Sequence, residues 1–210
     1  DGTSYIKINR GYQGATTPET TKLAKLFNTK VVKHDEDLRR KQTFALNLND
    51  GITAEWWMKK DGMSNLTESI FSLSSSSGYL DIHLSNGATP IVITISGSTN
   101  VSSHVLSSGL NISDLTDNEW HHYCISVYRE DSMLKTNFYM DGVSNKIRGF
   151  VSDVGEIIDA PTGQIGSVLR TGTTISNLEA ELDDFRFWNK KQSSEAIYNN
   201  YYRAIGGGAN

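Results

Sequence analysis

The chain has 210 residues and a net charge of −4 with acidic and basic residues interspersed, so it lacks the basic stripe typical of nucleic-acid-binding proteins. This length suits one all-β domain, or one domain with an arm, that buries roughly 70% of its unfolded surface without cross-links. No apolar run approaches the roughly 20 residues that span a bilayer, so we expect no membrane insertion. The single cysteine, Cys124, excludes an internal disulfide and is expected to be a small strand residue.

Residues 1–43 differ from the rest of the chain and are predicted to form an N-terminal arm. Residues 4–8 alternate between apolar and polar side chains, which is typical of an edge strand. Thr17 and Pro18 then form a helix-start signal, with threonine as the cap and proline at the first helical position. We expect a short helix there, on an arm or a long surface connection. An arm that docks on a neighbouring subunit is the functional alternative.

From Phe44 onward apolar residues recur with a period of two, which predicts a β-sandwich over residues 44–205, followed by a flexible glycine-rich tail at 206–210. Asp50 and Gly51 form the first tight-turn signal. Further short strands, separated by similar signals, are predicted at residues 53–59, 70–74, 79–84, 91–96, near 101–106, 123–127 and 134–140. Turns at this spacing are typical of two stacked antiparallel sheets.

The alternation also predicts which side chains face the interior. In residues 53–59 the even-numbered side chains share one face and the odd-numbered ones share the other. The expected core is lined by Trp56, Ile125, Phe138 and Phe185. Near the end of the chain, Ser193 is a helix-cap signal, and Ile197 and Tyr201 form an apolar i,i+4 pair, which together predict a short C-terminal helix.

Four segments resemble, in the right order, motifs of the laminin-G-like, concanavalin A-like jelly-roll family: residues 53–59, 119–122, 139–142 and 182–188. The resemblance covers residues 44–203. It implies an all-β, two-sheet antiparallel jelly-roll sandwich, here with an N-terminal arm and a short C-terminal helix. Because members of this family mostly bind other molecules and rarely catalyse reactions, it also implies a recognition or assembly module.

The resemblance gives structural roles to six motif residues: Trp120, His121, Asp141, Gly142, Asp183 and Trp188. Trp120 is expected to pack at a sheet edge, and His121 to bond a neighbouring loop rather than a metal. The Asp-Gly pair is expected to form a turn. Asp183 has the same parity as the two phenylalanines that follow it, so we expect it to point inward and accept backbone N–H bonds.

The same fold also hosts glycoside hydrolases, which need paired carboxylates on one strand face. Glu179, Glu181 and Asp183 share a face and are the nearest match. The residues after Asp183 depart from the hydrolase pattern, and the run aligns with the family's non-catalytic closing strand. We therefore expect no enzymatic activity, with glycoside hydrolysis kept as an alternative.

Calcium is the only cofactor that the resemblance leaves open, because pentraxin-like relatives bind it with acids that follow a strand. The matching stretch, residues 165–170, contains no carboxylate and ends in Arg170, so that site is expected to be lost. Two acidic clusters elsewhere are candidate calcium sites or, more simply, solvated loops. One consists of Asp153, Glu156 and Asp159, and the other of Asp114, Asp117 and Asn118.

Sugar recognition needs an exposed aromatic platform beside hydrogen-bonding groups. Trp57 is one candidate platform, although we expect the N-terminal arm or the second sheet to cover it. Tyr79 is a second candidate, with Asp81 and His83 on the same parity. These four residues are the candidate ligand-binding residues.

The sequence thus predicts a non-catalytic recognition or assembly module on an extracellular or virion surface. It is expected to bind a glycan or a surface protein through rim loops and one sheet face, with the sandwich as a rigid scaffold. Self-association or a larger assembly is also expected. The alternative is a purely structural subunit of a fibre, filament or phage particle that has no soluble ligand.

Overall fold

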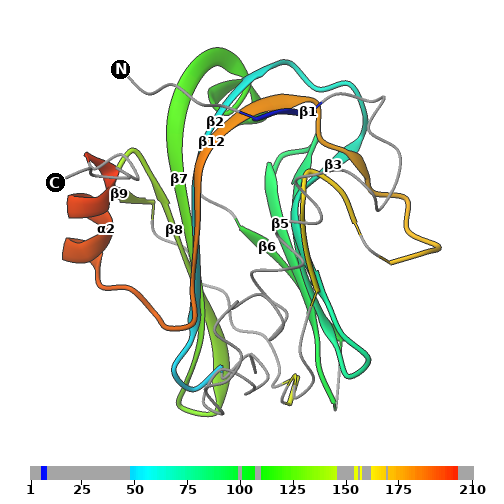
Figure 1. The fold of residues 1–210 in the computed structure, drawn as a ribbon, viewed down its shortest axis with the longest axis vertical. Helices are drawn as coiled ribbons and strands as arrows, with labels where there is room; N and C mark the ends of the chain where they lie inside the picture. Colours follow the sequence, from blue (N-terminus) through cyan, green and yellow to red (C-terminus); the bar gives the residue numbers. More distant parts are fainter. Residues whose placement is uncertain are drawn as a thin grey trace, which may run out of the picture.

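The computed structural model describes residues 6–8, 48–98, 101–106, 110–145, 154–155, 157, 162–168 and 170–202. These residues form two stacked sheets of mainly antiparallel strands, with one short α-helix on the outside (Figure 1). The helix predicted at Thr17, most of the first predicted strand from Phe44, and the glycine-rich tail lie outside this set. Within it, no helix is both long and apolar enough to cross a membrane.

The first sheet has the strand order β1-β12-β2-β7-β8-β9. Its strands are β1 (Ile6–Ile8), β2 (Ile52–Asp61), β7 (Asp117–Glu130), β8 (Met133–Met140), β9 (Val143–Asn145) and β12 (Ala180–Trp188). β1 is the edge strand predicted within the arm, and it pairs with β12 so that Ile6 lies opposite Leu182. Strands from the two ends of the chain therefore lie side by side.

The second sheet has the order β10-β3-β4-β5-β6. Its strands are β3 (Thr67–Ser74), β4 (Tyr79–Ser85), β5 (Ile91–Ser96), β6 (Val101–Leu106) and β10 (Thr162–Ile165). A two-residue strand, β11 (Ser176–Asn177), pairs with β3 in parallel and is the exception to the antiparallel pattern. The strands predicted from alternation between residues 53 and 140 are all confirmed.

Apolar side chains from the facing sides of the two sheets form one core. Trp56, Ile125 and Phe138 are fully buried in it, and Phe185 packs against it, so the predicted core is confirmed. The Trp56 ring stacks on Tyr123 and Phe185, with centroids 5.8 Å and 6.2 Å away. Each buried side chain of this size stabilises the fold by about 1.5–3 kcal/mol relative to exposure.

Two hairpin turns use residues in the left-handed region, where the backbone twist suits a hairpin. Asp131 and Ser132, with φ of 53° and 59°, join β7 to β8. Asp141 and Gly142, with φ of 51° and 73°, join β8 to β9, which confirms the Asp-Gly turn. Asp and Gly tolerate this conformation better than bulky residues do.

Strand β12 contains a bulge that simple alternation does not predict. The register shifts after Asp183, and Asp184 adopts a φ of 47°. Asp183 pairs with Trp57, which faces outward, whereas Phe187 pairs with Ala54, which faces the core. The prediction that Asp183 points inward is therefore wrong, because the bulge inverts the parity between it and the phenylalanines. Its Oδ1 does accept the backbone N–H of Asp184, at 2.8 Å.

Helix α2 (Ser194–Tyr201) packs on the outer face of the first sheet, on the side away from the second sheet (Figure 1). The Ser193 side chain accepts the backbone N–H of Ala196 at 3.1 Å, which confirms the predicted cap. Beneath the helix, Cys124 forms a small buried cluster with Tyr139 and Ile197. Burial raises the pKa of the Cys124 thiol, so this cysteine is a packing residue rather than a reactive one.

A buried ion pair joins the two sheets. Lys60 Nζ in β2 donates to Glu68 Oε2 in β3 over 2.7 Å, and both side chains are buried. Glu68 also accepts the backbone N–H groups of Ser64 at 2.8 Å, Asn65 at 3.1 Å and Glu179 at 3.1 Å. The carboxylate therefore has partners on both oxygens, and it connects the β2–β3 turn to the segment that enters β12.

Replacing Lys60 by Met would leave the Glu68 carboxylate buried without its cation. We expect the free energy of unfolding to fall by about 3–5 kcal/mol, measured by urea denaturation. The neighbouring substitution Lys59→Met, at a partly exposed position, is the control and should change stability by no more than about 0.5 kcal/mol. A fall of less than about 1 kcal/mol in the free energy of unfolding of Lys60→Met would show that the ion pair does not hold the two sheets together.

Candidate functional site

The outer face of the second sheet is rich in hydroxyl groups. One cross-strand row consists of Ser72, Asp81 and Thr94, and the next consists of Ser74, Tyr79 and Ser96. Core residues occupy the alternate positions on these strands. Tyr79, Asp81 and His83 therefore share the outer face, as their parity predicted.

Asp81 is the buried centre of this face. Its side chain has no exposed surface. Its Oδ1 accepts the Ser72 hydroxyl at 2.7 Å, and its Oδ2 accepts Arg170 Nε at 3.0 Å and a second bond from Arg170 Nη2. A buried carboxylate requires such partners, and the two bonds from one guanidinium fix the direction of Arg170.

Arg170 lies over the aromatic ring of Tyr79, with its Cζ 3.8 Å from the ring centroid. This distance is typical of a cation–π contact. Asp81 and Tyr79 therefore hold the guanidinium from two directions, and the Arg170 side chain is 27% exposed. Arg170 belongs to the connection between β10 and β11. It ends the stretch, residues 165–170, that matches the calcium-binding position of pentraxin-like relatives but contains no carboxylate.

A hollow of about 540 Å³ opens beside this pair. Its lining consists of residues 74–79 of the β3–β4 hairpin together with Ser96, Arg170 and Thr171. Gly78 permits the close approach of this hairpin to β5, because a Cβ atom there would lie 2.2 Å from the Ser96 carbonyl oxygen. Apart from Arg170, the lining offers hydroxyl groups, the Tyr79 ring and backbone.

His83 lies one position further along the same face and is nearly buried. Its Nδ1 has no hydrogen-bond partner among the described residues. Burial lowers the pKa of His83, an effect opposed by nearby Asp81 and reinforced by Arg170. The imidazole is therefore uncharged near neutral pH, and it is not part of the lining of the hollow.

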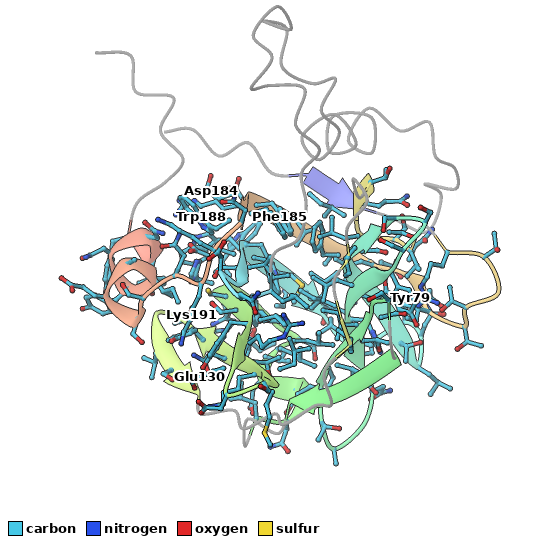
Figure 2. All side chains as sticks on the ribbon, turned by 90° about the horizontal axis from the view of Figure 1, so that it is seen from below. Tyr79, Glu130, Asp184, Phe185, Trp188 and Lys191 are labelled. Carbon is cyan, nitrogen blue, oxygen red and sulfur yellow. The ribbon has the colours of Figure 1, made fainter. Side chains whose placement is uncertain are left out.

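Trp57, the other candidate platform, lies on the outer face of the first sheet. Its ring stacks on Tyr201 of α2, with centroids 5.4 Å apart and planes at 18°, and it also contacts His122. Among the described residues the cover is helix α2 rather than the second sheet; most of the N-terminal arm, the other expected cover, lies outside the described residues. Trp57 belongs to the first sheet, whereas Tyr79, Asp81 and His83 belong to the second. Figure 2 shows Trp188, also of the first sheet, on the opposite side of the sandwich from Tyr79. The four candidate ligand-binding residues therefore do not form one site.

The motif residues Trp188 and Trp120 lie on strands β12 and β7 of the first sheet. Trp188 Nε1 donates to the buried Glu55 Oε1 at 3.1 Å, and Asn200 of α2 donates to the same oxygen at 3.3 Å. Arg186 adds an ion pair to Glu55 at 3.7 Å. Trp120 is half-buried on the first part of β7. The indole of Trp188 thus helps to fix the helix on the sheet.

His121 bonds neighbouring segments, as predicted. Its Nδ1 lies 2.7 Å from Asp141 Oδ2, and its Nε2 lies 3.1 Å from Asp117 Oδ2. The second oxygen of Asp141 accepts the backbone N–H of His122 at 2.9 Å. Asp141 therefore ties the β8–β9 turn to β7, in addition to forming the turn.

The first predicted calcium cluster lies outside the described residues: Asp153, Glu156 and Asp159. In the second cluster, Asp114 accepts the backbone N–H of Asn111 at 2.7 Å, and Asp117 accepts that of Glu119 at 3.0 Å. These carboxylates serve the local chain. Within the part of the chain that is described, no three His, Cys, Asp or Glu side chains converge on a possible metal site.

The three acids of the hydrolase alternative lie on or beside the first sheet, not at the hollow. The Glu179 carboxylate accepts the Ser64 hydroxyl, and Glu181 lies opposite Lys59. Asp183 lies at the bulge, where burial raises the pKa of its carboxyl. Glu181 and Asp183 lie on β12, as the sequence pattern predicted, whereas Glu179 precedes the strand.

A protein-family model described as the concanavalin A-like lectin/glucanases superfamily matches residues 34–198. The chain belongs to this superfamily. Among solved structures, it is similar to a native heptameric SAP-like pentraxin from Limulus polyphemus, with a TM-score of 0.52 and 17% identity over 77% of this chain and 74% of the other. No curated protein sequence matches it.

Two further structures share the superfamily fold. Domain 4 of an extracellular GH43 arabinanase from Geobacillus stearothermophilus, in complex with arabinotriose, has a TM-score of 0.52 and 11% identity over 73% of this chain and 68% of the other. Mouse laminin α1 domains LG4-5 have a TM-score of 0.51 and 10% identity over 78% of this chain and 40% of the other. At these identities the likeness concerns the fold alone, and it confirms the predicted jelly-roll class.

The sequence did not single out for binding Arg170, Ser72 or the serine, threonine and glycine residues that line the hollow. Arg170 was noted only as a cation in place of a calcium ligand. Its partner Asp81 is 89 positions away, and no spacing rule connects them. The parity of Ser72 on β3 was the only available signal that it lies on the face of Asp81.

The pKa of His121 predicts a pH-dependent stability. Partial burial alone lowers this pKa, but the hydrogen bonds that the imidazole makes to the Asp117 and Asp141 carboxylates outweigh this effect and raise the pKa above 6.5. The stabilising contribution is therefore complete below about pH 6.5 and is lost as the pH rises through the folded-state pKa. His121→Gln should lower the free energy of unfolding by about 1 kcal/mol near pH 5.5 and by less near pH 8, after allowance for solvent screening.

The control is His83→Gln, followed by the same urea titrations. Because burial lowers the pKa of His83, the unfolded chain binds a proton there more readily than the folded one, and the wild type loses stability as the pH falls below 6.5. The glutamine variant has no titrating group at this position and does not show this loss. The two variants should therefore differ from wild type with opposite pH trends. A constant difference for His121→Gln across the range would contradict the assignment.

Proposed function

We propose that this domain is a non-catalytic glycan-binding module whose binding site is the hollow beside Tyr79 and Arg170. The proposal rests on one observation: the Tyr79 ring and the fixed Arg170 guanidinium lie beside a hydroxyl-lined hollow of about 540 Å³. Ligand sites are typically hollows of about 300–1,000 Å³ in which a few polar groups have fixed positions. Sugars present both hydroxyl groups and apolar ring faces, which this lining complements.

The superfamily gives independent support, since its name covers lectins as well as glucanases. The arabinanase domain 4 that shares the fold was solved with arabinotriose bound. A non-catalytic role is favoured because the described lining contains no Asp or Glu, and the nearest acid, Asp81, is fully buried and paired with Arg170. Hydrolysis would need two accessible carboxylates. Such a module suits an extracellular or virion surface.

Tyr79→Ala should reduce glycan affinity about tenfold, because it removes the aromatic face and loosens Arg170. Binding would first be detected on a glycan array and then measured by isothermal titration. Tyr198→Ala is the control, since Tyr198 is 51% exposed on helix α2, which packs on the first sheet and not on the second. The proposal fails if the array shows no glycan binding, or if Tyr79→Ala binds as well as wild type.

A second candidate function, self-assembly through the β6 edge, is favoured by the charge distribution. No Asp, Glu, Lys or Arg occurs between Ile82 and Ser113, a segment that includes β5 and β6. β6 is the outermost described strand of its sheet. Exposed edge strands usually carry charges that prevent pairing with another chain, so an uncharged edge suits contact with a second copy.

Ser103→Lys would place a charge on β6, and we expect it to abolish concentration-dependent association measured by sedimentation velocity. Ser144→Lys, at an exposed position on β9, an edge strand of the first sheet, is the matched control and should associate like wild type. A wild-type chain that stays monomeric at all concentrations would exclude this second function. Equal association of the Ser103→Lys variant would exclude the β6 edge as the contact.

A further inference from the structure

The two charges at the hollow are unequally exposed. The Asp81 carboxylate is fully buried, whereas the Arg170 side chain keeps 27% of its surface. The rest of the described lining consists of serine, glycine, tyrosine and threonine. Although the pair is neutral overall, the charge that a ligand can reach is therefore the positive one.

Arg170 also keeps hydrogen-bond donors for a ligand. A guanidinium has five N–H donors arranged along two edges. Asp81 accepts from Nε and from Nη2, which occupies one edge. The other edge, formed by Nη1 and the second Nη2 hydrogen, has the geometry that binds a carboxylate or sulfate through two parallel bonds.

The guanidinium is fixed before any ligand arrives. Asp81 is itself held by the Ser72 hydroxyl at 2.7 Å, and the Tyr79 ring supports the guanidinium at 3.8 Å. An arginine already fixed loses little side-chain entropy on binding, which favours affinity. A ligand anion can join the free edge without separating Arg170 from Asp81, so no buried charge is left unpaired.

The geometry points to an acidic sugar, a hydroxyl-rich ring bearing a carboxylate or a sulfate, as the ligand of this hollow. The inference rests on the proposed glycan-binding function and narrows its ligand class. The anionic group pairs with the free edge of Arg170. The ring occupies the hydroxyl-lined space bounded by the β3–β4 hairpin, Ser96 and Thr171, which is too large for the anionic group alone.

The test is a glycan array of matched pairs. It presents oligosaccharides of glucuronic, galacturonic and sialic acid beside their carboxyl-reduced counterparts, and sulfated galactose oligomers beside desulfated ones. Wild-type protein should bind the best acidic member about tenfold more tightly than its neutral counterpart, as expected for a charge-assisted bidentate contact. The preference should weaken as salt is raised, because ions screen an exposed charge. The carboxylate and sulfate arms distinguish the two anionic groups.

The decisive variant is the double substitution Asp81→Asn with Arg170→Gln. It removes both charges together, so it leaves no unpaired buried carboxylate and keeps the net charge at −4. We expect it to lose the preference for acidic sugars while still binding neutral ones. Arg170→Lys keeps the charge but loses the planar edge, and should show a reduced preference. Lys135→Gln, on the other sheet, removes a distant cation and should leave the preference unchanged.

The outcomes separate the inference from the function on which it rests. Equal binding of acidic and neutral members, or a preference that survives in the double variant, overturns the inference. If neutral sugars bind and Tyr79→Ala abolishes that binding, the glycan-binding function stands alone. If nothing on the array binds, both are overturned. Should the double variant fail to fold, the salt dependence and the Arg170→Lys result still decide the matter.

Discussion

The carboxylate of Glu68 is the constraint on which the placement of the candidate site depends. It accepts hydrogen bonds from the Lys60 ammonium group of β2, from backbone N–H groups of the β2–β3 turn and from the backbone N–H of Glu179. Apolar packing between the sheets is non-directional, but a buried carboxylate is stable only with its oxygens satisfied. The segment entering β12 is therefore fixed beside β3. That segment directly follows β11, where the connection carrying Arg170 ends. The Leu178 N–H donates to the Gly166 carbonyl at 2.8 Å and so brings the two ends of this part of the chain together.

Asp81 follows the same physical rule with a different result. Like Glu68, it is fully buried and bonded to a cation from another segment of the chain. Lys60, however, is buried together with its partner, so that pair can only hold the structure together. Arg170 stays partly exposed, with donors directed away from Asp81. The exposure of the cation is what separates a structural joint from a surface able to bind an anion.

The sequence predicted the fold well because a period of two specifies both a strand and its buried face. Trp56, Ile125 and Phe138 lie in the core, and Tyr79 and Asp81 share the outer face, as parity required. Parity failed at Asp183, since one left-handed residue in the middle of a strand inverts every later position and leaves no periodic signal. The contact between Arg170 and Asp81 could not be predicted from the sequence either, because a connection between strands has no periodic pattern that specifies where it folds back.

The two outer faces of the sandwich are covered differently, and this difference supports the proposed location of the binding site. On the first sheet, α2 covers Trp57 with Tyr201 and contributes Asn200 to the buried Glu55 carboxylate. Opening that face would expose an aromatic layer and unsatisfied buried polar groups, so it is a second core rather than a binding surface. No described α-helix covers the second sheet, because α2 lies on the other side of the sandwich (Figure 2). The polar rows of the second sheet lead to the hollow at Arg170. The second sheet is therefore the described face that is open to a ligand, which is why the proposed binding site is the face of Tyr79 and Arg170.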